Sequence, residues 1–121
     1  MKYMLLVHHD ENVLNALTEI ELQATRFESA QLANEINSDN KYIDAAPLYS
    51  ASTGTCVRVR GGERLITDGP FAETREQLGG YYLINAQDLD EALAYAGRIP
   101  GARIGTVEVR PVMKLDGLPK R

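Results

Sequence analysis

The first strand that the sequence predicts is apolar on both of its faces. Along the short run from Tyr3 to His8, side chains alternate between two sides, with Tyr3, Leu5 and Val7 on one and Met4, Leu6 and His8 on the other. The later run "YYLI" at residues 81–84 has the same property. Because soluble monomers seldom expose a contiguous apolar face of that size, we expect both faces of the sheet to be covered.

Two helices are predicted between and beyond these strands. In the first, apolar residues at helical spacing form the stripe Val13, Leu17, Ile20, Ala24 and Phe27. Beyond Ser29 the apolar positions leave that stripe, which indicates a kink or a restart near Glu28 to Gln31. The second helix begins after Asp88, a capping residue, with a predicted buried face of Leu89, Ala92, Leu93, Ala96 and Ile99.

The remaining strands complete a recognisable order. The run "YIDAAPLYS" is a strand in which Pro47 indicates a sheet edge or a bulge. The run "TCVRVR-GG-ERLIT" predicts a hairpin that turns at Gly61-Gly62, and "GGYYLINA" and "TVEVRPV" are the last two strands. The fold class is therefore α+β: a ferredoxin-like β-α-β-β-α-β arrangement with an inserted β-hairpin. We expect one domain over residues 1–113 and a polar C-terminal tail over 114–121.

Two helices can cover only one face of such a sheet. The simplest cover for the second face is the same face of another copy, so we expect a homodimer with its sheets face to face. Because both faces of the first strand are apolar, the sequence leaves open which of them meets the partner.

Composition excludes several classes of protein. Apolar residues make up 44% of the 121 and charged residues 25%, as in ordinary globular domains. The net charge of -4 argues against nucleic-acid binding, and no apolar run is long enough to cross a membrane. The single cysteine, Cys56, excludes an internal disulfide and a cysteine-based zinc cluster. Cytoplasmic localisation is the expectation.

Three segments carry a family resemblance. "KYMLLV", "TDGPFAETREQLGGYYLI" and "DLDEALAYAGRIPGARIGTVEVRPV" resemble the YCII-related proteins, in particular the subgroup named for its Asp-Gly-Pro-Phe motif. The resemblance implies a dimeric α/β barrel, a fold that commonly houses cofactor-independent chemistry on small organic molecules. Some relatives use a His-Asp pair in a cleft, but the first helix here contains no histidine. A second reading is a non-enzymatic accessory protein that partners an extracytoplasmic-function sigma factor.

Residues 66–84, "ITDGPFAETREQLGGYYLI", supply most of the candidate site. Asp68-Gly69-Pro70-Phe71 is turn chemistry, which by itself explains the motif; the functional reading is that the turn aims Asp68 into a cleft. The polar loop that follows is longer than a usual connection, and such loops often carry binding groups. We therefore predict Asp68 or Glu73 as a catalytic base, with Phe71 and Arg75 contacting an unidentified small-molecule ligand.

His8 is the predicted proton shuttle, because it ends a strand and titrates near neutral pH. His9 points to the opposite side of the strand, so the two histidines do not make a metal site and none is predicted. Tyr81 and Tyr82 alternate, so that one faces the helices and the other faces the dimer interface; both are predicted to line the ligand cavity. No phosphate loop or dinucleotide fingerprint is present, so no cofactor is predicted.

Overall fold

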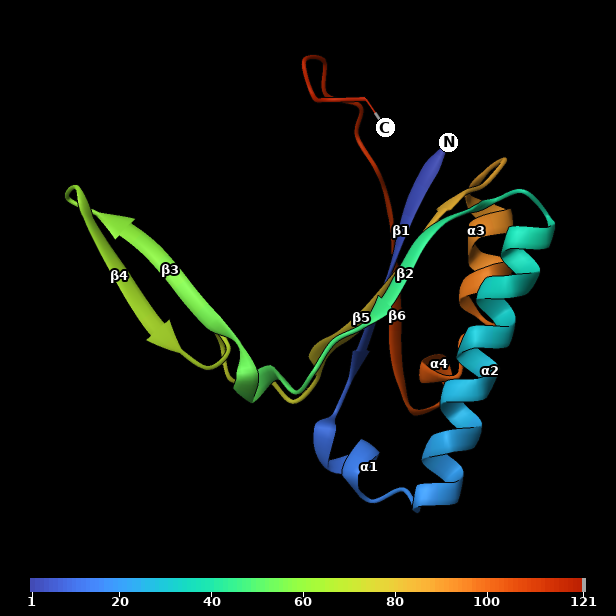
Figure 1. The fold of residues 1–121 in the computed structure, drawn as a ribbon, viewed down its shortest axis with the longest axis horizontal. Helices are drawn as coiled ribbons and strands as arrows, with labels where there is room; N and C mark the ends of the chain where they lie inside the picture. The colour runs from blue at the N-terminus through green and yellow to red at the C-terminus, as the bar shows by residue number, and fades with distance from the viewer. Residues whose placement is uncertain (121) are drawn as a thin grey trace.

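A four-stranded antiparallel sheet forms the centre of the molecule in a computed structural model that describes residues 1–120 (Figure 1). Its strand order is β2 (Tyr42–Pro47), β5 (Gln77–Asn85), β1 (Lys2–His9), β6 (Gly105–Pro111). This order, with helices between the strands, agrees with the predicted ferredoxin-like arrangement. β2 is an edge strand, which is one of the two readings that Pro47 indicated; the register shift in its pairing with β5 falls between Tyr42 and Asp44, away from Pro47.

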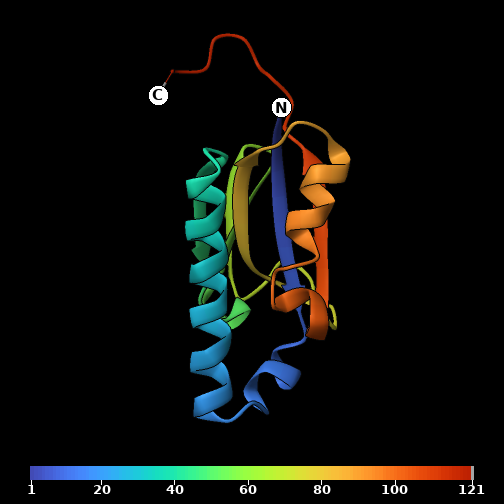
Figure 2. The ribbon, with the colours of Figure 1, turned by 90° about the vertical axis from the view of Figure 1, so that its right-hand side faces the viewer.

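The helices lie against one face of this sheet (Figures 1 and 2). α2 (Glu19–Ser38) and α3 (Leu89–Ala96) run side by side over it, and the short α4 (Gly101–Ile104) packs beside the end of β1. Tyr82 and the other buried side chains between helices and sheet form one core, which consists of Tyr3, Leu5, Leu32, Ile36, Tyr82, Ile84, Ala86, Ala92, Tyr95, Ala96 and Ile99. The side of β1 that carries Tyr3 and Leu5 therefore faces the helices.

The predicted break in the first helix is in the wrong place. α2 runs without interruption through residues 28–31, and the break falls earlier, between α1 (Glu11–Asn15) and Thr18. Thr18 begins α2 with a capping box: its hydroxyl accepts a hydrogen bond from the Glu21 N–H, and the Glu21 carboxylate accepts one from the Thr18 N–H. This pair satisfies two N–H groups that a helix start otherwise leaves free.

The buried faces of the helices also differ from the prediction. α2 packs through Leu32 and Ile36, which lie roughly 120–160° around the helix from Ile20 at ~100° per residue. Ile20 and Phe27, on the predicted stripe, are 81% and 69% exposed. For the second helix the prediction holds in part: Ala92, Ala96 and Ile99 are buried as expected. Tyr95 also enters the core, whereas Leu89 and Leu93 are each 48% exposed.

The inserted hairpin projects away from the sheet on the side opposite to the helices (Figure 1). It consists of β3 (Thr55–Arg60) and β4 (Glu63–Asp68), preceded by the 3-10 turn η1 (Ala51–Thr53), and residues 55–68 are called the arm below. Its register pairs Arg60 with Glu63 and Val57 with Ile66, as predicted. Gly61 and Gly62 turn the chain with φ of 55° and 81°, values that favour glycine.

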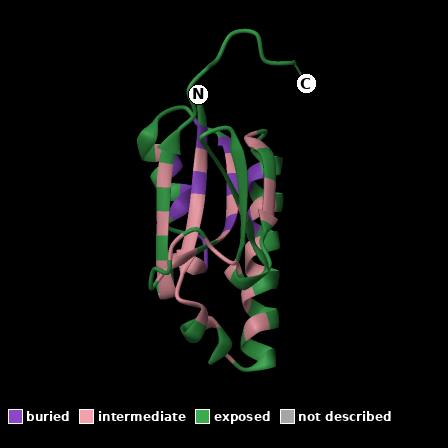
Figure 3. Cartoon of the chain, turned by 90° about the vertical axis from the view of Figure 1, so that its left-hand side faces the viewer, coloured by how far each residue is buried: buried purple, intermediate pink, exposed green. Residues whose placement is uncertain are grey.

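The second face of the sheet has no helix over it (Figure 3). Cross-strand pairing places an apolar centre of Met4, Leu6, Tyr81 and Leu83 on this face. Glu108 and Arg110 of β6 flank it, opposite Leu6 and Met4. Residues 112–120 are exposed and leave the sheet beyond β6 (Figure 1). The predicted tail begins within this segment, and its last residue, 121, lies outside the described residues. In the described chain, no helix is long and apolar enough to span a membrane.

Candidate functional site

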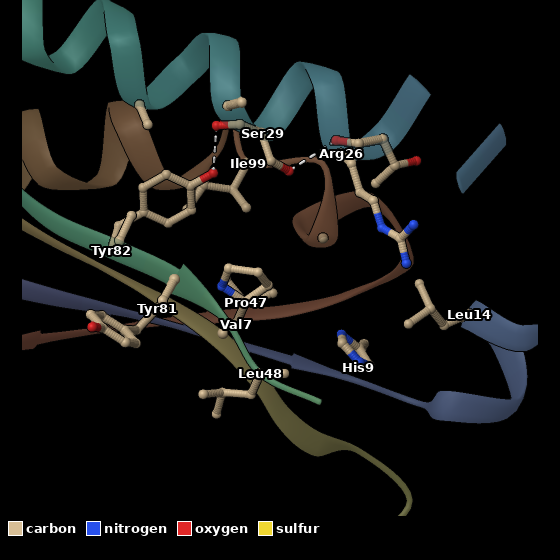
Figure 4. Close-up of a pocket in the computed structure, with 18 of the residues that line it drawn as sticks. Val7, His9, Leu14, Arg26, Ser29, Pro47, Leu48, Tyr81, Tyr82 and Ile99 are labelled. Atoms are coloured by element: carbon tan, nitrogen blue, oxygen red, sulfur yellow. Dashed lines mark hydrogen bonds between the residues drawn. The ribbon is translucent and has the colours of Figure 1, made fainter. Parts of the chain in front are cut away.

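A cleft of about 870 Å³ opens between α2 and the sheet, at the end of the molecule where α1 lies (Figure 4). β1, β2 and β5 contribute one wall, α2 contributes the other, and residues of α1 and α4 close the end. Val7, Tyr82, Ile99 and Ile104 give the cleft an apolar floor. A recess of this size with a mainly apolar lining is typical of small-molecule sites.

Tyr82 ties the two walls together. Its ring points from β5 toward α2 (Figure 4), and its hydroxyl donates a hydrogen bond to the Ser29 carbonyl oxygen at 2.9 Å. Burial raises the pKa of the Tyr82 hydroxyl, against the opposing effect of the Ser29 hydrogen bond, so this group stays protonated near neutral pH. Tyr82 is therefore a neutral donor that fixes the width of the cleft.

His9 enters the cleft from the end of β1. A register shift in the pairing of β1 with β5 leaves Gly79 without a partner between Gly80 and Leu78. The His9 ring occupies the space that a side chain at Gly79 would fill, since a β-carbon there would lie 2.6 Å from Nδ1. The bulge and the glycine thus admit an imidazole among the cleft-lining groups.

Glu11 holds the mouth of the cleft in place. Its carboxylate accepts hydrogen bonds from the Ser50 hydroxyl at 2.6 Å and from the Ala51 N–H at 2.8 Å, which join α1 to the start of η1. These two bonds, and secondarily the charge of His9, lower the pKa of Glu11 despite some loss of solvent. Glu11 is therefore ionised at neutral pH, and both of its oxygens are occupied.

Arg26 is the other charged residue that lines the cleft. Its side chain extends from α2 toward the open end, where His9 and Leu14 also lie (Figure 4). Among residues 1–120, no carboxylate forms an ion pair with Arg26, whereas Arg98 and Arg103 pair with Glu35 and Glu28. The cleft thus combines an apolar floor, an imidazole and an unpaired guanidinium.

The structure separates most of the residues predicted for the site. Asp68 ends the arm, and Phe71, Glu73 and Arg75 follow in the exposed connection to β5; the lining of the cleft includes none of these four. Gly69 in this turn has a φ of 91°, and its N–H donates to the Gly54 carbonyl oxygen, so the turn closes the base of the arm. The motif has a clear structural role, and the catalytic role of its carboxylates stays a prediction.

His8 and Tyr81 lie on the uncovered face of the sheet. His8 Nε2 is 3.1 Å from the Glu108 carboxylate on the neighbouring strand. The Tyr81 hydroxyl donates to Asp44 at 2.6 Å, a bond that raises the pKa of Tyr81. Tyr82 faces the helices, as predicted for one of the two tyrosines. Both residues border the cleft, but the Tyr81 ring points away from α2 (Figure 4).

Sequence reasoning missed His9, Arg26 and Glu11 as cleft residues. His9 lies on the same side of β1 as Leu5 and Val7. The sequence alone does not show that the helices cover this side, because both sides of the strand are apolar. Within residues 1–120, no three His, Cys, Asp or Glu side chains converge in a way that could hold a metal ion.

Comparison with known proteins places the whole chain in one family. Residues 1–116 match the YCII-related domain. The chain is also 35% identical over 114 residues to an uncharacterised protein, R00369, of Rhizobium meliloti (strain 1021). That match covers 93% of this chain and 92% of the relative.

Proposed function

The chain belongs to the YCII-related family, and from this premise we propose that it binds a small organic molecule in the cleft between α2 and the sheet. The observation that carries the proposal is the cleft itself, with about 870 Å³ of space beside an imidazole and an unpaired guanidinium. Membership of the Asp-Gly-Pro-Phe subgroup is part of the proposal and rests on residues 68–71. A cytoplasmic location fits this reading.

The proposal includes cofactor-independent catalysis in the cleft. His9 supports it, because an imidazole in the cleft can accept or donate a proton. The predicted base, Asp68 or Glu73, lies outside the cleft of a single chain. A role for either carboxylate, or for His8, in this chemistry therefore requires a second copy to bring it to the ligand.

A homodimer is the proposed assembly. The uncovered face has an apolar centre and charged flanks, the pattern of a protein interface. Burying more than ~400 Å² of apolar surface per chain contributes on the order of 10 kcal/mol at ~25 cal/mol per Å², before association costs. The arm adds exposed apolar side chains on the same side of the sheet, namely Val57, Val59, Leu65 and Ile66.

A second candidate function is that of an accessory protein, and the exposed face of α2 favours it. Ile20 and Phe27 lie on the opposite side of the molecule from the uncovered sheet face, so a face-to-face dimer leaves them exposed. An apolar stripe on a helix is a common docking surface for another protein. The sigma-factor partner implied by the family resemblance belongs to this reading.

Blocking the cleft tests the first proposal. Ala30 lines the cleft from α2, whereas Ala24 lies on the exposed face of the same helix, so Ala30→Phe fills the cleft and Ala24→Phe is its matched control. Ligands that raise the melting temperature in a screen of small organic molecules are titrated against both variants. We expect Ala30→Phe to weaken binding by at least about tenfold and Ala24→Phe to leave it unchanged.

The same titration distinguishes the cleft from the arm. If Asp68→Asn abolishes binding while Ala30→Phe has no effect, the ligand binds at the turn that the sequence motif predicts, and the cleft is not the site. Equal affinity for Ala30→Phe, Ala24→Phe and wild type also removes the cleft from the proposal.

A further inference from the structure

One charged side chain in the cleft has no partner of opposite charge. Of its lining residues, Glu11 and Arg26 carry full charges at neutral pH. Both oxygens of Glu11 are already bonded, to the Ser50 hydroxyl and to the Ala51 N–H. Arg26 has no ion-pair partner anywhere in residues 1–120, so its guanidinium is the group left to attract a ligand charge.

The same cleft offers surface for an apolar ligand body. Ile99 is buried in the core, and Val7 packs so closely on α4 that a β-carbon at Gly101 would lie 2.6 Å from its Cγ1. Tyr82 adds an aromatic ring that its hydrogen bond to α2 holds in place. These groups are packed before any ligand arrives, which limits the entropic cost of binding.

Arg26 and His9 lie near the open end of the cleft, beyond its apolar floor (Figure 4). Arg26 reaches toward the open end of the cleft from α2, and His9 rises from β1 below it (Figure 4). The His9 ring rests on Gly79 and so has a defined position. A ligand whose body lies on the apolar floor would place a terminal group between the guanidinium and the imidazole.

We propose that the cleft binds a small organic carboxylate with an apolar or aromatic body, and that its carboxylate lies on Arg26 with His9 as the second polar contact. This inference rests on the proposed small-molecule function and adds the chemical class of the ligand. A guanidinium pairs with a carboxylate through two parallel N–H bonds, which a neutral amide cannot reproduce. One such group suits a monoanion better than a phosphate ester, which usually collects several donors.

The test uses two matched pairs of probes: benzoate with benzamide, and hexanoate with hexanamide. Each is titrated into isotope-labelled protein at neutral pH and followed by backbone amide NMR. The proteins are wild type, Arg26→Gln, and Lys114→Gln as a control. The control removes one positive charge from the exposed segment after β6, at the other end of the molecule.

We expect benzoate and hexanoate to shift the backbone NMR signals of cleft residues. They should bind at least about tenfold more tightly than benzamide and hexanamide. Arg26→Gln should reduce acid binding to the level of the amides and leave amide binding unchanged, whereas Lys114→Gln should bind like wild type. The inference is overturned if wild type binds the acids and the amide probes with equal affinity. It is also overturned if Arg26→Gln binds the acids as tightly as Lys114→Gln does. Amide binding in the cleft with no preference for acids leaves the proposed function standing, and an absence of cleft shifts with all four probes contradicts both.

Discussion

The His9 imidazole lies against the backbone of Gly79, in the space that any larger residue at position 79 would occupy. Two adjacent strands thus place an imidazole in the cleft: β1 supplies the ring and β5 supplies the gap. Packing requires a glycine at position 79, because a side chain there would collide with the His9 ring. A substitution at Gly79 therefore displaces His9 while leaving the histidine itself in the sequence.

Gly79→Ala is predicted to displace the His9 ring and to weaken ligand binding by about fivefold or more, as expected for the loss of one polar contact. Gly97→Ala is the control, because a β-carbon there makes only ordinary contact, at 3.5 Å from the Leu93 carbonyl oxygen, in helical backbone. The measurement is the affinity of both variants for a carboxylate probe, together with the NMR signals of the His9 ring. Unchanged affinity with a displaced ring would show that His9 does not contact the ligand.

The packing of α2 predicts which of its apolar residues stabilise the fold. Ile36 is fully buried, so Ile36→Ala should lower the free energy of unfolding by about 2–5 kcal/mol. Phe27→Ala, on the exposed stripe, should change it by no more than about 0.5 kcal/mol. Urea unfolding of the two variants checks this, and a large cost at Phe27 would mean that a second copy or another part of the chain covers the stripe.

A hydrogen bond between helices predicts the alkaline stability profile. The Tyr95 hydroxyl donates to the Asp39 carboxylate at 2.6 Å, and this bond, with burial, raises the pKa of Tyr95 to about 12. Since the folded pKa exceeds the unfolded value of about 10, the stabilisation is complete below pH ~10 and is lost as the pH rises toward 12. Tyr95→Phe should therefore cost about 1–2 kcal/mol near pH 8 and progressively less between pH ~10 and ~12.

Unfolding midpoints of wild type and Tyr95→Phe across this range provide the check. Comparing the two proteins removes the contribution of Tyr81 and Tyr82, whose pKa values are also raised. A difference that stays constant between pH ~8 and ~12 would contradict a stabilising contribution from the protonated Tyr95–Asp39 pair.

The proposed homodimer predicts opposite results for lysines on the two sides of the molecule. Leu83 lies in the apolar centre of the uncovered sheet face, so Leu83→Lys should reduce the mass in light scattering from two chains to one. Phe27→Lys, on the exposed face of α2, should leave the mass at two chains. A wild-type mass of one chain at micromolar concentration, with a melting temperature independent of concentration, contradicts the dimer.

Much of the fold could be predicted from local signals. Short apolar runs and the alternation of apolar and polar residues predicted the strands. Gly61-Gly62 predicted the turn of the arm with its correct register. The buried side of α2 could not be predicted in the same way, because its most regular apolar stripe is on the outside. Thr18 and Glu21 form the capping box that marks the start of α2, and their spacing in the sequence is typical of such a box.

The cleft was harder to predict than the fold. The Asp68–Phe71 motif stands out in the sequence because turns require particular residues, and in the structure it closes the base of the arm. His9 and Arg26 are far apart in the sequence and carry no motif; only the packing of α2 on the sheet brings them to one cleft. Because both faces of β1 are apolar, strand parity alone did not favour His9 over His8.

The most direct test of the cleft as the ligand site is a crystallographic screen of small organic fragments that includes carboxylates. The account predicts that bound fragments gather on the floor formed by Val7 and Tyr82, with carboxylates oriented toward Arg26. Fragments gathered around Asp68 and Arg75, with the cleft empty, would contradict it.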